Sequence, residues 1–310
     1  PKTSRNKLQR HAAWWWLLFL VSLGPIAVAR LDSIITPLAI MGLLLAGTRP
    51  AIAGALLTVA TWIKVSPAAL LAAVLVSVKK QKSVLVSVLV TSAVIALIAL
   101  ILGAGGNLLS FLSQQTTRGL QIEAPLATPF LWLAALGQSG YAVYYDTVIL
   151  TFQVSGEGTA LVADLSSVLL GIGFIALLVW AFLLRRSGAD LNQLLPAVAL
   201  ALTMVLIVFN KVGSPQYIGW LAAPIIAGLV MSKSRFVAAA AISLVLAAFT
   251  QSFYPYLYNG LLSVQPLELS LLTVRNIGEV VLLAISGWLI YESRQSAKVP
   301  LESPAGSLEL

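Results

Sequence analysis

The stretch RPAIAGALLTVATWIKVSPAALLAAVL, residues Arg49–Leu75, is apolar on both sides of a single lysine, Lys64. Trp62 stands two residues before this lysine and Pro67 three residues after it. A cation inside a hydrophobic run costs at least about 2.5 kcal/mol at the centre of a bilayer, so it is expected to face a polar cavity or an interface and to have a partner there. The stretch therefore predicts a membrane-embedded fold and a functional site at Lys64.

The composition of the whole chain agrees with a membrane protein. Hydrophobic residues make up 59% of the 310 residues and charged residues 10%, against about 25% charged residues in a soluble domain. The apolar runs 84–102 and 159–184 have about the length, roughly 20 residues, that a helix needs to cross the hydrocarbon core. We therefore predict an all-α fold, a polytopic transmembrane helical bundle with short or re-entrant helices that line an extracytoplasmic cavity.

Several classes of site are excluded by residue counts. The chain has no cysteine, which excludes disulfides, thiolate metal sites and a cysteine nucleophile. Its one histidine, His11, lies in a basic leader, so a histidine-rich metal cluster is excluded as well. We predict no metal and no cofactor. The net charge of +8 can indicate nucleic-acid binding, but the basic residues lie mainly between apolar runs, so we predict no nucleic-acid partner.

Ten membrane-crossing segments are predicted within a single transmembrane domain, residues 1–310. They cover residues 12–29, 33–47, 50–63, 67–78, 83–102, 159–184, 191–209, 216–231, 236–253 and 269–291. A long outer loop, 103–158, contains a short apolar piece, Phe130–Leu136, and a β-prone stretch rich in tyrosine, YAVYYDTVILTFQV. A cytoplasmic tail, 292–310, ends the chain.

The distribution of lysine and arginine predicts the orientation. Cytoplasmic connections carry an excess of these residues, and most of them fall on one side only if the chain reverses near Lys64–Pro67. Residues 50–63 and 67–78 would then be two short helices, each reaching about 20 Å or less, with a turn below the outer surface. The alternative is one long tilted helix from which Lys64 extends toward the interface.

Charged and polar residues cluster at three further places on the predicted outer side. Arg30 and Asp32 follow the first span; they form either an ion pair that ends the helix or a site in which Asp32 acts as a general base. Arg118 and Glu123 lie in the loop TTRGLQIEAPLATP, where arginine suits a phosphate or sugar hydroxyls, although charged loop residues are usually just solvated.

The third place is the turn VFNKVGSPQYIGW, which separates two apolar spans. A plain turn needs only its glycine and proline. The added polar residues form a group able to hold an anion and a hydroxylated ligand: Lys211, Ser214, Gln216 and Tyr217. On the last predicted span, Arg275 and Glu279 have the i, i+4 spacing of a salt bridge within one helix.

Taken in order, RPAIAGALLTVATWIKVSPAALL, RGLQIEAP and NKVGSPQYIGW resemble the bacterial membrane mannosyltransferases of glycosyltransferase family 87, in the GT-C superfamily. The resemblance covers residues 14–225. It implies an extracytoplasmic active site at the bacterial plasma membrane, a polyprenyl-phosphate hexose donor, most readily mannose, and a glycolipid or cell-envelope glycan acceptor. The implied reaction is an inverting displacement in which a carboxylate takes the acceptor proton and cations stabilise the departing lipid phosphate.

The resemblance also assigns roles to residues. It implies that Lys64 and Arg118 face the donor phosphate, and that Lys211, Ser214, Gln216 and Tyr217 hold donor phosphate or sugar. Members of the superfamily have further helices before the matched region and carry their catalytic aspartate in the first outer loop. This chain begins at Pro1 without Met, so it is expected to be either processed or a fragment that lacks earlier spans. A fragment is expected to be inactive alone, and Asp32 is then a substitute base or merely structural.

Two other classes of function predict different features. A transporter or flippase of a lipid-linked sugar would also place cations in cavities and break helices, but such proteins often carry paired internal repeats, and the sequence has no second copy of the Lys64 turn. A scaffold subunit predicts no polar group at the outer face. Glycosyl transfer is therefore the favoured function.

Overall fold

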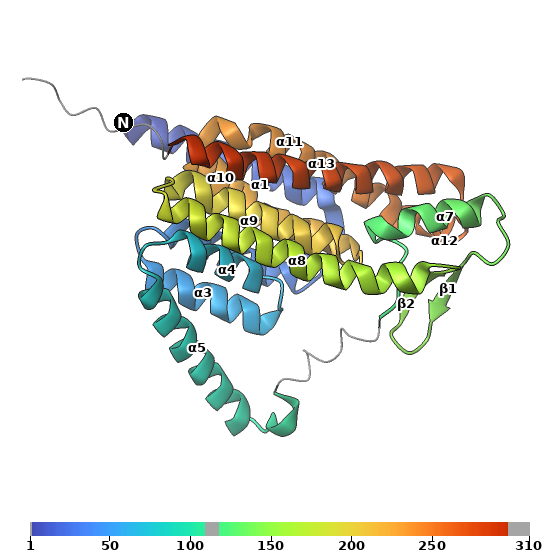
Figure 1. Ribbon diagram of the computed structural model, residues 1–310, viewed down its shortest axis with the longest axis horizontal. Coiled ribbons are helices and arrows are strands. Elements are labelled where there is room, and N and C mark those ends of the chain that lie inside the picture. Colours follow the sequence, from blue (N-terminus) through green and yellow to red (C-terminus); the bar gives the residue numbers. More distant parts are fainter. Residues whose placement is uncertain (1, 109–117, 297–310) are drawn as a thin grey trace, which may run out of the picture.

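A computed structural model of the protein describes residues 2–108 and 118–296 (Figure 1). Its α-helices are α1 (Lys2–Leu23), α2 (Asp32–Leu45), α3 (Pro50–Ile63), α4 (Ala68–Ser77), α5 (Gln81–Ile101), α7 (Thr128–Ala135), α8 (Thr159–Arg186), α9 (Leu191–Val208), α10 (Ala222–Met231), α11 (Val237–Gln251), α12 (Tyr258–Leu262) and α13 (Pro266–Ser296). Shorter helical turns are η1 (Gly24–Ala27), η2 (Gly105–Asn107), η3 (Pro125–Ala127), η4 (Pro215–Leu221), η5 (Lys233–Phe236) and η6 (Ser252–Tyr256). Strands β1 (Ala142–Asp146) and β2 (Thr151–Ser155) complete the described part.

Five helices in this part of the chain are long and apolar enough to cross a membrane. They are α5, α8, α9, α13 and the segment Ser234–Tyr256 around α11. Four of the other predicted spans form apolar helices of 10–17 residues, and the span predicted over 12–29 forms the apolar second half of α1 with η1. Length and composition therefore support five of the ten predicted crossings, and the prediction of a multi-pass helical bundle is confirmed at this level.

Helix α9 is the centre of the bundle. From Leu194 to Met204 every residue of α9 is buried, which is the pattern of a helix that is apolar all round and surrounded by others. Helices α4, α8, α10 and α13 pack against it. In contrast, α5 stands away from the bundle (Figure 1), packs mainly on α3 and buries only Val84, so its apolar surface suits contact with lipid.

The chain reverses at Lys64, as the charge distribution predicted. Helix α3 ends at Ile63, Lys64 is extended with φ −157° and ψ 140°, and α4 begins after Pro67. Both far ends of this hairpin lie beside the turn between α8 and α9: Arg185 Nη1 donates to the carbonyl of Val78 at 3.0 Å, and a Cβ on Gly47 would lie 3.2 Å from Leu191. The alternative of a single long helix is therefore wrong.

The two helices of this hairpin are short. With 14 and 10 residues at about 1.5 Å of rise each, α3 and α4 are about 21 and 15 Å long, whereas the 28 residues of α8 extend over about 42 Å. The turn between α3 and α4 consequently lies alongside the longer helices and does not reach their ends. The cation therefore lies below the outer ends of the longer helices, as the sequence predicted, with its side chain 23% exposed.

A small second layer covers one end of the bundle, on the right in Figure 1. Strands β1 and β2 pair antiparallel, which confirms the β-prone stretch, and a bridge between Gln121 and Gln153 adds the preceding loop to β2. Helices α7 and α12 lie beside these strands in Figure 1. Their own apolar core includes Leu120, Ile122 and Phe253. The loop that carries Glu123 is therefore fixed between β2 and the helices.

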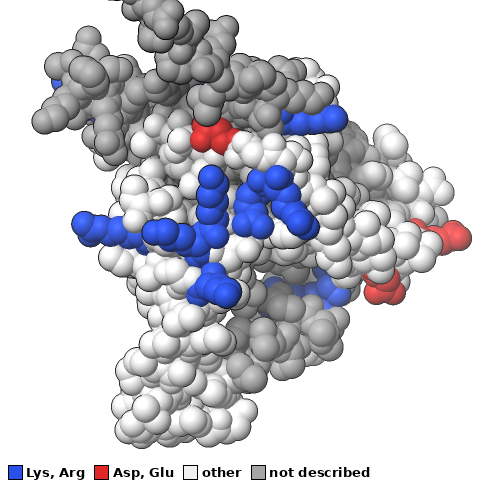
Figure 2. All heavy atoms as spheres, turned by 60° about the vertical axis from the view of Figure 1, so that its left-hand side comes forward, with Lys and Arg blue, Asp and Glu red and all other residues white. Residues whose placement is uncertain are grey.

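Basic side chains gather at the end of the molecule away from this layer (Figure 2). Exposed Arg49, Lys79, Lys80, Arg186 and Arg235 lie at the ends of helices that meet there. The described part of the chain is thus polarised along its long axis, in the sense that the positive-inside rule requires. The predicted tail from residue 297 and loop residues 109–117 lie outside the described residues.

Candidate functional site

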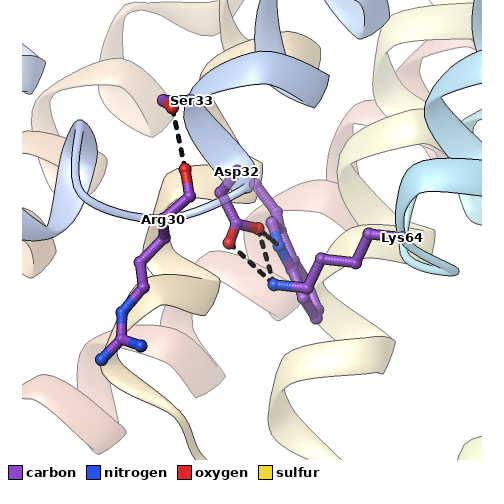
Figure 3. A network of polar contacts seen from close by, with 5 residues as sticks. Arg30, Asp32, Ser33 and Lys64 are labelled. Carbon is purple, nitrogen blue, oxygen red and sulfur yellow. Dashed lines mark hydrogen bonds and ion pairs between the residues drawn. The ribbon is translucent and has the colours of Figure 1, made fainter.

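An ion pair at the α3–α4 turn is the centre of the candidate site (Figure 3). Lys64 Nζ lies 2.9 Å from Oδ1 and 2.7 Å from Oδ2 of Asp32. The indole Nε1 of Trp220 donates a further hydrogen bond to Oδ1 at 2.6 Å. Asp32 is the first residue of α2, where the helix dipole also stabilises a negative charge. The carboxylate is therefore held by two side chains from distant parts of the chain and by the end of its own helix.

Two aromatic rings complete the environment of the lysine. Tyr217 and Trp220 stack with their ring centroids 4.0 Å apart, and Lys64 Nζ lies 5.7 and 5.4 Å from the two centroids. These distances suit cation–π attraction. The side chain of Lys64 is 23% exposed and that of Asp32 6%. The lysine side chain therefore keeps some exposure, while its carboxylate partner is almost fully buried.

The local sequence explains how the aromatic pair forms. Pro215 begins the 3₁₀ turn η4, and residues three apart lie on the same face of a 3₁₀ helix. Tyr217 and Trp220 have this spacing. Sequence reasoning named Tyr217 and missed Trp220; the i, i+3 spacing of two aromatic residues after a Gly-Ser-Pro turn is the signal that would have found it.

The ion pair suggested between Arg30 and Asp32 is not formed among the described residues, which is a correction to one reading of the sequence. Figure 3 shows Arg30 pointing away from Asp32, and the Arg30 backbone carbonyl accepts a hydrogen bond from Ser33 Oγ at 2.8 Å. Asp32 instead binds Lys64, whose ammonium reaches it from the facing hairpin. Arg30 is exposed and lines the cavity described next.

A polar cavity of about 420 Å³ brings together four of the residues predicted from the sequence. Arg30, Glu123, Ser214 and Gln216 all line it. Gln216 also lines a neighbouring pocket of about 120 Å³, whose other walls are mainly apolar and which includes Asp32. Five predicted residues from three separate stretches of sequence, Arg30, Asp32, Glu123, Ser214 and Gln216, therefore line two cavities that meet at Gln216.

Glu123 forms part of the cavity wall and is itself buried. The Tyr258 hydroxyl donates to Glu123 Oε1 at 2.5 Å, and Arg275 Nη2 donates to the backbone carbonyl of Glu123 at 3.1 Å. Burial raises the pKa of the Glu123 carboxyl above its ordinary value, and the bond from Tyr258 and the charge of Arg275 oppose this shift only in part. Burial and the neighbouring Glu123 likewise raise the pKa of the Tyr258 hydroxyl.

The loop that carries Lys211 packs directly on the loop that carries Glu123. The backbone N–H of Gln121 donates to the carbonyl of Lys211 at 2.9 Å. A Cβ on Gly213 would lie 2.1 Å from the backbone nitrogen of Ala124, so this close approach requires glycine. These contacts bring the loop that carries Arg118 and Glu123 together with the turn that carries Lys211 and Ser214.

Arg118 belongs to the same neighbourhood. The phenol of Tyr217 lies within electrostatic range of Arg118, Asp32 and Glu123. Arg118 is half-buried, and its Nε has no hydrogen-bond partner among the described residues. The structure therefore places a second positive charge, the Arg118 guanidinium, within electrostatic range of Tyr217.

The predicted Arg275–Glu279 salt bridge is confirmed, and both side chains are buried. The guanidinium of Arg275 also lies 5.3 Å from the ring centroid of Phe253. Because Arg275 holds the backbone of Glu123, this pair connects α13 to the outer loop. Sequence reasoning did not predict this connection, nor the part played by Tyr258.

No family model, curated protein or solved structure matches this chain. The resemblance to glycosyltransferase family 87 therefore stays a prediction. Within the described residues, no three His, Cys, Asp or Glu side chains form a group that would hold a metal ion. The chemistry offered is that of an accessible ammonium, two buried carboxyl groups and a polar cavity beside an apolar pocket.

Proposed function

We propose that the protein is a membrane glycosyltransferase that transfers a hexose, mannose in the first instance, from a polyprenyl-phosphate donor to a glycolipid or cell-envelope glycan. The reaction would take place on the extracytoplasmic side of a bacterial plasma membrane. One observation carries the proposal: Lys64 interrupts an apolar helical hairpin, its side chain remains partly exposed, and its ammonium lies between a buried carboxylate and two aromatic rings. Membrane helices rarely contain such a cation without a functional role.

The proposed roles follow from the charges and contacts. Lys64, with Arg118, faces the donor phosphate, because the singly charged phosphodiester of the donor is a natural partner for a partly exposed lysine and gains negative charge as the polyprenyl phosphate departs. Phosphate binding would weaken the contact of Lys64 with Asp32 and free that carboxylate to act as a base. The acceptor oxygen would then attack the anomeric carbon, the bond to the phosphate would break, and Asp32 would take the acceptor proton.

The two compartments fit the two parts of such a donor. The apolar pocket between α1, α2 and η4 suits the first isoprene units, and the polar cavity suits the hexose. Ile26 and Gln216 line both. Ser214, Gln216 and Tyr217 lie on one turn at this junction, as required of residues that hold the phosphate or the sugar. Arg30, Glu123 and Lys211 lie on the loops around it.

The test is transfer of labelled sugar. The full-length protein in membranes is incubated with labelled polyprenyl-phosphate mannose, and lipids and glycans are extracted and separated. Label in a glycolipid or glycan supports the proposal. Movement of intact donor across the bilayer without transfer would instead support a flippase and contradict it. Membranes without the protein, and membranes with a Lys82→Met variant at the opposite, basic end, serve as controls.

A further inference from the structure

The polar cavity has an aromatic wall that the roles above leave unused. Tyr145, Phe152, Tyr254 and Tyr258 line it from β1, β2, η6 and α12. Their rings form a connected series: Tyr145–Phe152 with centroids 4.9 Å apart, Phe152–Tyr258 6.0 Å and Tyr254–Tyr258 5.0 Å. Four aromatic residues from four elements therefore converge on one polar cavity, although simple membrane anchoring would place them on the outer surface.

A carboxyl group at the base of this wall has unused bonding capacity. Oε1 of Glu123 accepts the bond from Tyr258, whereas Oε2 is closed to solvent and has no hydrogen-bond partner among the described residues. A buried oxygen without a partner is destabilising, because it has lost its hydrogen bonds to water and gained none in return. Residues from two other loops, Arg30, Ser214 and Gln216, supply further donors and acceptors around the same cavity. The site is therefore built to receive a group that donates hydrogen bonds.

We propose that this cavity binds a hexopyranose, with one sugar hydroxyl donating to Glu123 and one C–H face of the ring packed on Tyr145, Tyr254 or Tyr258. A hexopyranose combines an apolar ring face with a rim of hydroxyl groups, which matches an aromatic wall opposite polar side chains. The cavity volume of about 420 Å³ is within the range of small-molecule sites. The inference deepens the proposed function, on which it rests only for the choice of mannose as the sugar.

Other ligand classes fit less well. The Glu123 carboxyl disfavours a phosphate at this position, which points to Lys64 as the phosphate site. An aliphatic chain would leave the free oxygen of Glu123 without a partner. The hexose can come from the donor or from the acceptor, since both present the same ring. The experiment below separates these two sources.

The absence of cysteine from the sequence allows a clean binding assay. A single cysteine is introduced at Leu150, which lines the cavity and is 69% exposed, and in a second protein at Leu136, which is 77% exposed and does not line it. Both proteins are purified in nanodiscs with no glycoside detergent present. The rate of maleimide labelling is measured with increasing methyl mannoside or mannose 1-phosphate, up to roughly 100 mM, the weak range expected of a monosaccharide.

We expect sugar to slow labelling at position 150 at least threefold and to leave the rate at position 136 unchanged. Protection by methyl mannoside identifies an acceptor-type hexose, and protection by mannose 1-phosphate alone identifies the hexose of the donor; either supports the sugar site. In the Glu123→Gln background the same protection should require about tenfold more sugar, because the amide NH2 that replaces one carboxyl oxygen cannot accept a hydrogen bond from a sugar hydroxyl. If Glu123→Gln does not fold, Tyr258→Phe, which removes the hydroxyl beside Glu123 and keeps the ring, is used instead.

Equal effects at positions 150 and 136, or no protection by either sugar, would overturn the inference. The readout does not depend on catalysis, so the two proposals can fail separately. A protein that is protected by hexoside but does not transfer label contradicts the glycosyltransferase proposal and retains the sugar site. A protein that transfers label without protection at position 150 retains the enzyme and removes this cavity as its hexose site.

Discussion

Replacing Lys64 with methionine tests the central ion pair. The change removes the ammonium that lies 2.7 Å from Asp32 Oδ2 and keeps an unbranched side chain of similar length. Asp32 would retain only the hydrogen bond from Trp220 and the favourable end of α2. We expect the folded protein to lose stability and, if it is the proposed enzyme, to lose transfer, because no cation would remain at the turn to hold the donor phosphate.

The size of the effect follows from burial. Removing one partner of a fully buried ion pair costs about 3–5 kcal/mol. Lys64 is 23% exposed, so water already screens part of the interaction, and we expect about 2–3 kcal/mol. Unfolding entropy is about 2.1 cal/mol/K per residue, which for 310 residues converts this cost into a fall in melting temperature of about 3–5 °C.

The assay is a double-mutant cycle followed by intrinsic fluorescence, for which the eight tryptophans supply signal. Lys64→Met, Asp32→Asn and the double variant are compared with wild type, and Lys82→Met, at an exposed position, controls for loss of a positive charge. The double variant should be destabilised less than the sum of the singles, because the buried carboxylate is neutralised together with its partner. Additive effects, or an unchanged melting temperature and transfer rate for Lys64→Met, would refute the reasoning.

Three further substitutions test neighbouring features, each by melting temperature. Burial raises the Glu123 pKa above 4.5, so the folded protein keeps a proton that the unfolded chain releases. The stability that Glu123 contributes is therefore present below about pH 4.5 and is lost as the pH rises through the folded pKa. Glu123→Gln should flatten this dependence of melting temperature on pH, and an unchanged profile would exclude Glu123 as its source. Gly213→Ala should cost about 1–3 kcal/mol by forcing the loop off Ala124, whereas Gly171→Ala, with open space around it, should not destabilise; equal effects would disprove the close approach. Trp220→Phe keeps an aromatic ring but removes the Nε1 donor to Asp32, and should cost about 1.5–3 kcal/mol; no change would mean that this bond contributes little.

Features set by local chemistry could be predicted from the sequence. Hydropathy located the apolar helices, and Pro67 with the basic residues on either side located the reversal at Lys64. The tyrosine-rich stretch gave β1 and β2, and i, i+4 spacing gave the pair on α13. Each of these depends on neighbours in the chain, so the pattern in one segment was sufficient.

Partners from distant segments could not be predicted in the same way. Asp32 lies 32 residues before Lys64 and 188 before Trp220, and Glu123 lies 135 before Tyr258. Which side chains meet depends on how α2, the hairpin and η4 pack, and the order of these elements along the chain does not determine their rotation. One of the two readings of Arg30 and Asp32 paired these neighbours, whereas Arg30 points away from Asp32.

The Lys64–Asp32 and Arg275–Glu279 ion pairs differ in ways that favour a functional role for the first and a structural role for the second. Arg275 and Glu279 come from one helix and are 2% and 0% exposed. Arg275 also binds the backbone of a loop, so both charges are satisfied by contacts inside the protein. Asp32 begins α2 and Lys64 lies in the turn between α3 and α4, where its side chain is 23% exposed beside two aromatic rings. A buried ion pair is weak support for stability in itself. An ion pair whose cation is more exposed than its anion can accept a second anion, and this asymmetry supports the proposal that Lys64 binds phosphate.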